Sequence, residues 1–322
     1  MSRQEVLVIG PIMPFVVERL KQHHDVVECE NEADSAGVLA REGSRFRAVA
    51  VGLHGLSAKT IAALPKLEII ASFGVGYDAV DVAAAARAGV VVTHTPGVLT
   101  EEVADTALGL MLMTVRELSA AERHLREGRW QSEGNYRLSD GSLTGAVLGI
   151  VGLGRIGKAI AKRAEACGMK IHYHGRHRQA DIAYPYHETV VDLARAADVV
   201  MVVAPGGAQT RHLINADVLA ALGPHGYLIN IGRGSVVDEA ALVAALREGV
   251  IRGAGLDVFD DEPNVPSDLI DLPNAVLLPH VGSASRATRQ AMGQLVVDNI
   301  CAWLEGKPPL TPVPETPVPD RS

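Results

Sequence analysis

The stretch AVLGIVGLGRIGKAIAKRAEACG, residues 146–168, places a short apolar run, a glycine-rich turn and a helical segment in direct succession. The apolar run is typical of a strand that is buried on both faces of a sheet. The turn fits the spacing G-x-G-x-x-G. In that pattern Gly152 permits a tight turn, Gly154 lets the backbone approach a pyrophosphate, and Gly157 lets helix and strand pack closely. The N–H groups expected to face the phosphates are those of Leu153, Gly154, Arg155 and Ile156. The succession predicts a dinucleotide-binding unit, and the alternative is a plain strand-to-helix turn with three glycines.

About twenty residues after such a turn, many dinucleotide-binding folds carry an Asp or Glu that holds a ribose hydroxyl. In the stretch IHYHGRHRQ, residues 171–179, Gly175 and Arg176 take this place, followed by His177 and Arg178. Gly175 leaves room for a 2′-phosphate, and Arg176 can form a charge-assisted bond to it. Arg178 or His177 can add a second contact. The stretch predicts a preference for NADP(H) over NAD(H), and the alternative is a solvated basic loop.

Strand-like and helical segments alternate on both sides of this unit. Further strand-like runs occupy residues 5–10, 25–30, 47–52, 67–74, 90–94, 170–175, 198–204, 226–232, 253–258 and 275–280. Strands that alternate with helices predict parallel sheets covered on both faces. We therefore expect an α/β fold with two Rossmann-like domains and a cleft between them. A long helix is expected from about Thr100 to Glu127, and a final helix over 285–306.

The composition argues against a nucleic-acid-binding protein and against a membrane protein. A length of 322 residues suits roughly two domains, and a net charge of -8 argues against nucleic-acid binding. No apolar run reaches the ~18 residues of a membrane span, and we expect no signal peptide. Cys29, Cys167 and Cys301 form no close pair, which favours a reducing cytoplasm. His172 and His174 could face a metal together, but no Cys or carboxylate completes the set, so no metal is expected.

Three residues follow late strands: Arg233 after GYLINIG, Glu262 after GAGLDVFDD and His280 after AVLLP. The carboxyl ends of parallel strands open onto the ligand crevice, so the three side chains can converge. His280 can act as an acid or base near neutral pH, Glu262 can orient its ring, and Arg233 can hold a carboxylate. This set suits the reduction of a 2-oxo acid. Taken singly, each residue could equally be a loop cap, a surface acid or a packed histidine.

Five runs carry a family resemblance that covers nearly the whole chain. They are SFGVGYDAVDVAAAARAGVVVTHTPGVLTEEVADTALGLML, GIVGLGRIGKAIAKRAEACG, LINIGRGSVVDEAALVAAL, GAGLDVFDDEP and LLPHVGSAS. The chain resembles the D-isomer-specific 2-hydroxyacid dehydrogenase family. The resemblance implies that Arg233 binds substrate, Glu262 tunes the histidine and His280 is the acid/base. It also implies substrate contacts from Val75 and Gly76, with Leu53 and His54 nearby. Further cofactor contacts are expected at Thr106, Ala204, Pro205, Ile231, Asp257 and Gly282, with Asp257 meeting the nicotinamide carboxamide.

Within the family the chain is most similar to NADPH-dependent glyoxylate/hydroxypyruvate reductases and plant-type hydroxyphenylpyruvate reductases, which also carry an arginine at the position of Arg176. The expected activity is reduction of glyoxylate or hydroxypyruvate to the D-2-hydroxy acid. One alternative is an NAD-linked enzyme of phosphoglycerate or D-lactate type. Another is a non-enzymatic, nucleotide-binding corepressor of the same fold.

The resemblance also implies a layout. Residues 98–287 form the NADP-binding domain, and residues 1–97 and 288–322 together form the substrate-binding domain. A homodimer is expected through the nucleotide domains, by the long helix and the segment after it. That segment, 130–142, lacks the extra tryptophans of the reductase pattern, one of which reaches the neighbouring active site in related enzymes. Arg137 or Tyr136 is expected in its place.

Overall fold

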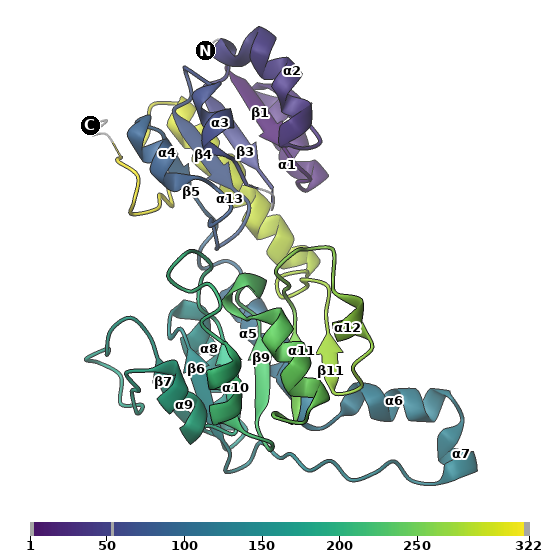
Figure 1. The fold of residues 1–322 in the computed structure, drawn as a ribbon. Coiled ribbons are helices and arrows are strands. Elements are labelled where there is room, and N and C mark those ends of the chain that lie inside the picture. The colour runs from purple at the N-terminus through teal and green to yellow at the C-terminus, as the bar shows by residue number, and fades with distance from the viewer. Residues whose placement is uncertain (1–2, 53–54, 319–322) are drawn as a thin grey trace. The chain divides into compact units, whose positions relative to one another are not determined.

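The computed structural model describes residues 3–52 and 55–318, and its chain divides into two units. Unit 1 joins Met1–Leu99 to Ser285–Ser322, and unit 2 is the continuous segment Thr100–Ala284. Each unit has its own sheet, in which all paired strands run parallel (Figure 1). The prediction of an α/β fold with two parallel sheets is confirmed. No helix among the described residues is both long and apolar enough to cross a membrane.

Unit 1 is built around a five-stranded sheet in the order β2-β1-β3-β4-β5. The strands are β1 Glu5–Ile9, β2 Asp25–Cys29, β3 Ala48–Val51, β4 Ile69–Ser72 and β5 Val91–Thr93. Its helices are α1 Pro14–His23, α2 Glu32–Glu42, α3 Ala58–Ala62, α4 Val82–Arg87 and α13 Arg286–Leu304, with a 3₁₀ turn, η1, at Gly43–Arg45. Helices α2, α3 and α4 share one apolar core with the sheet. Helix α13 packs closely on α1, because a Cβ on Gly293 would lie 2.4 Å from the Phe15 ring.

The chain's last segment completes unit 1. Thr93 of β5 pairs antiparallel with Pro312, and Val313 N–H donates to the carbonyl of Val92 at 2.9 Å. Trp303 of α13 is buried and donates to Glu68, which also accepts two hydrogen bonds from Arg47. The first hundred residues and the last forty therefore form one core.

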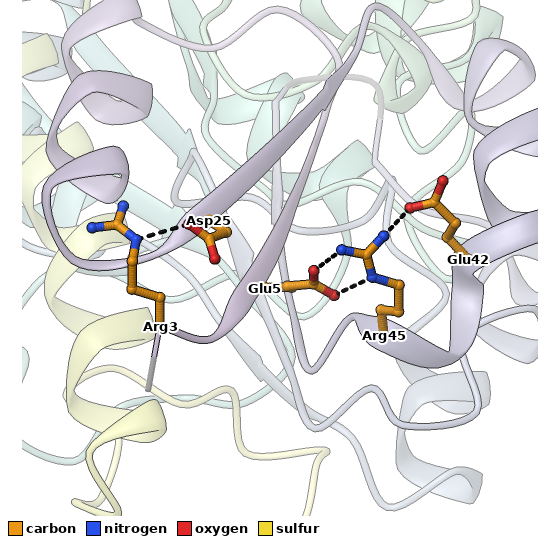
Figure 2. Close-up of polar contacts among 5 residues, drawn as sticks. All are labelled: Arg3, Glu5, Asp25, Glu42 and Arg45. Carbon is orange, nitrogen blue, oxygen red and sulfur yellow. Dashed lines mark hydrogen bonds and ion pairs between the residues drawn. The ribbon is translucent and has the colours of Figure 1, made fainter. Parts of the chain in front are cut away.

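Two groups of ion pairs lie near the starts of β1 and β2 and at the end of α2 in unit 1 (Figure 2). Arg3 Nε lies 2.8 Å from Asp25 Oδ1, and Arg45 is shared between Glu5 and Glu42. These pairs are largely exposed, so water screens them and each adds little to stability. The apolar core, and not this network, holds the strands together.

Unit 2 contains a six-stranded sheet in the order β11-β10-β9-β8-β6-β7. The strands are β6 Val147–Val151, β7 Lys170–His174, β8 Val199–Val202, β9 Tyr227–Asn230, β10 Gly253–Leu256 and β11 Ala275–Leu277. Its helices are α5 Thr100–Val115, α6 Leu118–Arg126, α7 Arg129–Glu133, α8 Arg155–Ala166, α9 Val190–Ala196, α10 Ala216–Leu222, α11 Glu239–Arg247 and α12 Ser267–Ile270, with a 3₁₀ turn, η2, at Gly234–Val236. Helices α9, α10 and α11 share a core with the sheet. The chain runs outward from β6 to β7 and then crosses to β8 on the other side. Ligands bind at such a reversal in open α/β sheets.

The expected single helix from Thr100 to Glu127 is wrong, because the structure breaks it between α5 and α6. Glu117 has a φ of 53°, in the left-handed region that a right-handed helix cannot continue through. Its carboxylate accepts a hydrogen bond from the Tyr136 hydroxyl at 3.0 Å and lies 2.6 Å from Arg137 Nη2. Contacts from twenty residues further along the chain therefore hold the break, and α6 and α7 extend beyond the sheet of unit 2 (Figure 1).

Candidate active site

The glycine-rich turn joins β6 to α8, and each glycine has a different steric role. Gly152 has a φ of 99°, and a Cβ on it would lie 2.9 Å from Ala204 N. A Cβ on Gly157 would lie 2.4 Å from the carbonyl oxygen of Gly152. Gly154 caps α8, and a Cβ there would meet no atom within 4 Å. The first and third glycines therefore allow the turn and the packing, whereas the second leaves open space.

This difference gives a matched pair of variants. Gly157→Ala should lower the free energy of unfolding by about 1–3 kcal/mol, the usual cost of overpacking. Gly154→Ala should leave the fold nearly as stable, since its φ of -82° suits alanine, but should weaken dinucleotide binding about tenfold or more. Urea denaturation and nucleotide titration separate the two effects. A Gly154→Ala variant that binds nucleotide as tightly as the wild type would contradict the role of the turn.

The basic loop follows β7, as the sequence predicts. Arg176, His177 and Arg178 are exposed, and a Cβ on Gly175 would have no neighbour nearer than 4.0 Å. Within residues 3–52 and 55–318, neither Arg176 nor Arg178 forms an ion pair. Both guanidinium groups and the space beside Gly175 are therefore available to an anion.

The histidines of β7 are engaged with His187. His172 Nδ1 lies 3.0 Å from His187 Nε2, and the two rings stack with centroids 5.1 Å apart. His174 Nδ1 lies 3.0 Å from the carbonyl oxygen of His187. Burial, followed by the nearby His187 and Lys170, lowers the pKa of His172. Among the described residues, no group of three or more His, Cys, Asp or Glu is arranged to hold a metal ion.

The structure brings together three of the other predicted cofactor residues. Asp257 is 1% exposed, and its carboxylate accepts the N–H groups of Val281 and Gly282, both at 2.8 Å. The Thr106 hydroxyl donates to the carbonyl of Gly282 at 3.2 Å. Burial raises the pKa of Asp257, although the two N–H donors oppose this shift. The segment after His280 is thus fixed to α5 and to the end of β10. The remaining predicted residues follow other strands of the same sheet: Ala204 and Pro205 follow β8, and Ile231 follows β9.

Glu262 and His280 form the pair that the sequence predicts. His280 Nδ1 lies 2.6 Å from Glu262 Oε2, and the second carboxylate oxygen accepts the N–H of Phe259 at 3.0 Å. Burial raises the pKa of Glu262, but the hydrogen bonds from His280 and Phe259 and the charges of His280 and Arg233 outweigh it, so that this pKa lies below its usual value. The carboxylate therefore stays ionised and orients the imidazole through Nδ1.

The backbone at His280 is unusual. Its φ is 52°, and its N–H donates to the carbonyl of Asp257 at 2.9 Å. A non-glycine residue in this region is uncommon and is often found at functional sites. The hydrogen bond from the His280 N–H to the residue after β10 therefore helps to hold this backbone conformation.

Arg233 lies on the loop after β9. Its carbonyl accepts the Asn230 side-chain amide at 2.9 Å, and its Nη1 donates to the carbonyl of Gly232 at 3.0 Å. A Cβ on the next residue, Gly234, would lie 1.8 Å from the carbonyl carbon of Phe259. The loop that carries Arg233 therefore packs directly on the loop that carries Glu262.

A further residue, Glu239, ties these loops together, and the sequence reasoning did not identify it. Its Oε1 accepts the N–H of Asp260 at 2.8 Å. Asp238 caps α11, so the acidic pair in VVDEAAL reads locally as an ordinary helix start. Nothing in the local sequence around Glu239 indicates that it contacts Asp260.

The predicted substrate contacts outside unit 2 fall in unit 1. Val75 and Gly76 lie in the loop after β4, and the Val75 carbonyl is 2.8 Å from His94 Nδ1. Leu53 and His54 lie outside the described residues. Their roles stay predictions.

Comparisons with known proteins support one family. The family model described as "D-isomer specific 2-hydroxyacid dehydrogenase, NAD binding domain" matches residues 108–282. Glyoxylate/hydroxypyruvate reductase A HPR2 of Arabidopsis thaliana is 45% identical over 309 residues, which are 96% of this chain and 98% of that protein. Hydroxyphenylpyruvate reductase of Plectranthus scutellarioides is also 45% identical, with the same coverage.

A solved structure agrees. The NADPH-dependent glyoxylate/hydroxypyruvate reductase of Sinorhizobium meliloti, crystallised with NADP and malonate, is 54% identical and superimposes with a TM-score of 0.95, covering 100% of both chains. The resemblance drawn from the five sequence runs is confirmed. The chain belongs to the D-isomer-specific 2-hydroxyacid dehydrogenase family.

Proposed function

We propose that this protein reduces a small 2-oxo acid, glyoxylate or hydroxypyruvate, to the D-2-hydroxy acid with NADPH. The observation that carries the proposal is the Glu262–His280 pair, which lies on the same sheet edge as Arg233 and the glycine-rich turn. The curated relatives named above are reductases of this substrate class, and the Sinorhizobium enzyme was crystallised with NADP. This support favours the reductase over the NAD-linked and corepressor alternatives.

Each residue of the site has a separate role in the proposed reduction. Arg233 offers a planar, doubly donating group for the substrate carboxylate. His280 donates a proton from Nε2 to the carbonyl oxygen as that oxygen becomes negative. Glu262 binds the imidazole at Nδ1 and thereby fixes the orientation of the ring. The cofactor supplies the hydride when it is bound. Asp257 and Thr106 would hold the nicotinamide side of the site.

The chain's own residues fit NADP(H). A Cβ on Gly154 would meet no atom within 4 Å and one on Gly175 none nearer than 4.0 Å, which agrees with a pyrophosphate at the turn and a 2′-phosphate beside the loop. Arg176 and Arg178 supply positive charge there, with no acidic side chain in the loop from 175 to 179. The cofactor contacts are proposed at the turn, at this loop and at the strand ends already described.

Arg176→Ala should lose about 1.5–3 kcal/mol of NADPH binding, the usual worth of a hydrogen bond to a charged group. NADH binding should hardly change. Isothermal titration with both cofactors measures this, and Arg195→Ala, on the exposed side of α9, is a matched control. Unchanged NADPH affinity in Arg176→Ala would show that the loop is only solvated.

The activity itself is tested by consumption of NADPH and of NADH, each with hydroxypyruvate and with glyoxylate, compared as kcat/KM. Turnover with a strong NADPH preference supports the proposal. Better use of NADH would favour the NAD-linked alternative, and failure to turn over any 2-oxo acid would favour a binding protein.

We further propose that residues 98–287 bind the nucleotide and that 1–97 with 288–322 supply substrate contacts from Val75, Gly76, Leu53 and His54. The division of the chain into two compact units supports this layout, since the boundaries fall between residues 99 and 100 and between residues 284 and 285. Exchanging Gly76 for a bulky residue should raise KM for the 2-oxo acid and leave cofactor affinity unchanged.

A homodimer is proposed through the extension formed by α6, α7 and the following loop. The large apolar residues Leu118, Leu125, Trp130 and Leu138 are 46–90% exposed there. Several exposed large apolar residues on one projecting segment suit a protein interface. Tyr136 and Arg137, expected near the neighbouring site, contact Glu117 of their own chain. Light scattering tests the dimer, and a monomer at micromolar concentration would contradict it.

The three unpaired cysteines agree with the proposed cytoplasmic location.

A further inference from the structure

Gln179 connects two parts of unit 2 that the proposed cofactor would span. Its backbone N–H donates to the Tyr173 hydroxyl at 2.9 Å. Its side-chain Nε2 donates to the carbonyl of Leu153 at 2.8 Å. Leu153 lies in the glycine-rich turn, whereas Gln179 ends the basic loop. Tyr173 and Leu153 are both buried, so the two contacts are partly shielded from water.

The contact with Leu153 has a consequence for the turn. The peptide between Leu153 and Gly154 is trans, so its carbonyl and its N–H point in opposite directions. A hydrogen bond that fixes the carbonyl therefore also fixes the direction of the Gly154 N–H. Gln179 thus orients one peptide of the phosphate-binding turn from a distance of 26 residues in the sequence.

The other end of the basic loop is also held. The Tyr186 hydroxyl donates to the carbonyl of Gly175 at 3.2 Å. Residues 185–187 pair with β7 through Tyr173, whose N–H donates to Pro185 and whose carbonyl accepts from His187, both at 2.9 Å. The backbone of the loop is therefore anchored at both ends, and the side chains of Arg176, His177 and Arg178 remain exposed.

We propose that Gln179 is a positioning residue for cofactor selection. It holds the basic loop in a fixed place relative to the glycine-rich turn. The loop can then bind the 2′-phosphate while the turn binds the pyrophosphate of the same NADP(H) molecule. The inference rests on the proposed function, in which Arg176 contacts the 2′-phosphate. NAD(H) lacks the 2′-phosphate and therefore lacks the proposed contact with Arg176. Loosening the loop therefore weakens the phosphorylated cofactor more, because the entropy of ordering the loop is then lost on binding.

The test is binding of NADP⁺ and of NAD⁺ to Gln179→Met, which keeps the length of the side chain and removes its donor. Titration calorimetry should show the Kd for NADP⁺ raised about tenfold and that for NAD⁺ raised by a clearly smaller factor. Gln22→Met, at an exposed position on α1, is the matched control. Tyr173→Phe removes the other contact and should act in the same direction. Thermal melting checks that each variant is folded.

A double-mutant cycle with Arg176→Ala separates positioning from a general structural role. If Gln179 acts on selection through Arg176, Gln179→Met in the Arg176→Ala background should weaken NADP⁺ binding no more than it weakens NAD⁺ binding. Equal weakening of both cofactors, unchanged affinities, or additive effects in the cycle would each overturn the inference. The proposed function fails in a different way, through a wild-type protein that binds NAD⁺ as tightly as NADP⁺ and an Arg176→Ala variant without effect.

Discussion

Replacing His280 by asparagine should lower kcat for 2-oxo acid reduction about 10²–10⁴-fold, the usual contribution of a general acid. Asparagine tolerates the left-handed backbone that this position adopts, at a φ of 52°, so the fold should survive. It cannot transfer a proton near neutral pH. Affinity for NADPH should stay unchanged, because the described contacts of the turn and of the basic loop do not include His280. Steady-state kinetics and cofactor titration measure the two quantities.

His212→Asn is a matched control for this experiment. His212 also has a positive φ, 51°, lies in the same unit and is not one of the predicted site residues. Its replacement should leave kcat near the wild-type value. If His280→Asn turned over at the wild-type rate, another group would have to be the acid, and the Glu262–His280 hydrogen bond would be structural.

Replacing Arg233 should lower kcat/KM for the 2-oxo acid by about as large a factor as replacing His280 lowers kcat. Two hydrogen bonds to a carboxylate are worth about 1.5–3 kcal/mol each, so Arg233→Met should lower kcat/KM about 10²–10⁴-fold. Arg233→Lys keeps the charge and loses the planar fork, and it should recover only part of this loss. Saturation curves with hydroxypyruvate at fixed NADPH measure the change.

Arg247→Met, at an exposed site on α11 that pairs with Asp268, controls for the loss of one arginine in the same unit. The Arg233 variants should also keep their stability, since Gly234 and not the guanidinium forms the tight contact with Phe259. Wild-type kcat/KM in Arg233→Met would contradict substrate binding by this residue.

Much of unit 2 could be predicted because its signals are local. The turn at 152–157 combines a strand, three glycines and a helix within 23 residues, and the structure gives each glycine a distinct steric reason. The Glu262–His280 contact also followed from a simple rule, since the ends of neighbouring parallel strands meet at one edge.

The features that could not be predicted are contacts between residues that lie far apart in the sequence. The apolar first half of 100–127 suits one helix, yet Glu117 turns the chain because Tyr136 and Arg137 hold its carboxylate. Glu239 and Gln179 have unremarkable local surroundings, and only the folded chain shows Asp260 and Leu153 beside them. Periodicity reports which face of an element is buried, but not which polar groups meet across loops.

The pairing of β5 with the tail at 311–313 has a consequence for synthesis of the chain. Unit 2 is continuous and can fold as soon as it leaves the ribosome, whereas the first 99 residues must wait for α13 and the tail. Until then the edge of β5 and the surface that Trp303 covers stay open to other chains. A nascent or C-terminally truncated chain should therefore combine a folded nucleotide unit with an aggregation-prone N-terminal one, and should depend on chaperones more than the finished protein does.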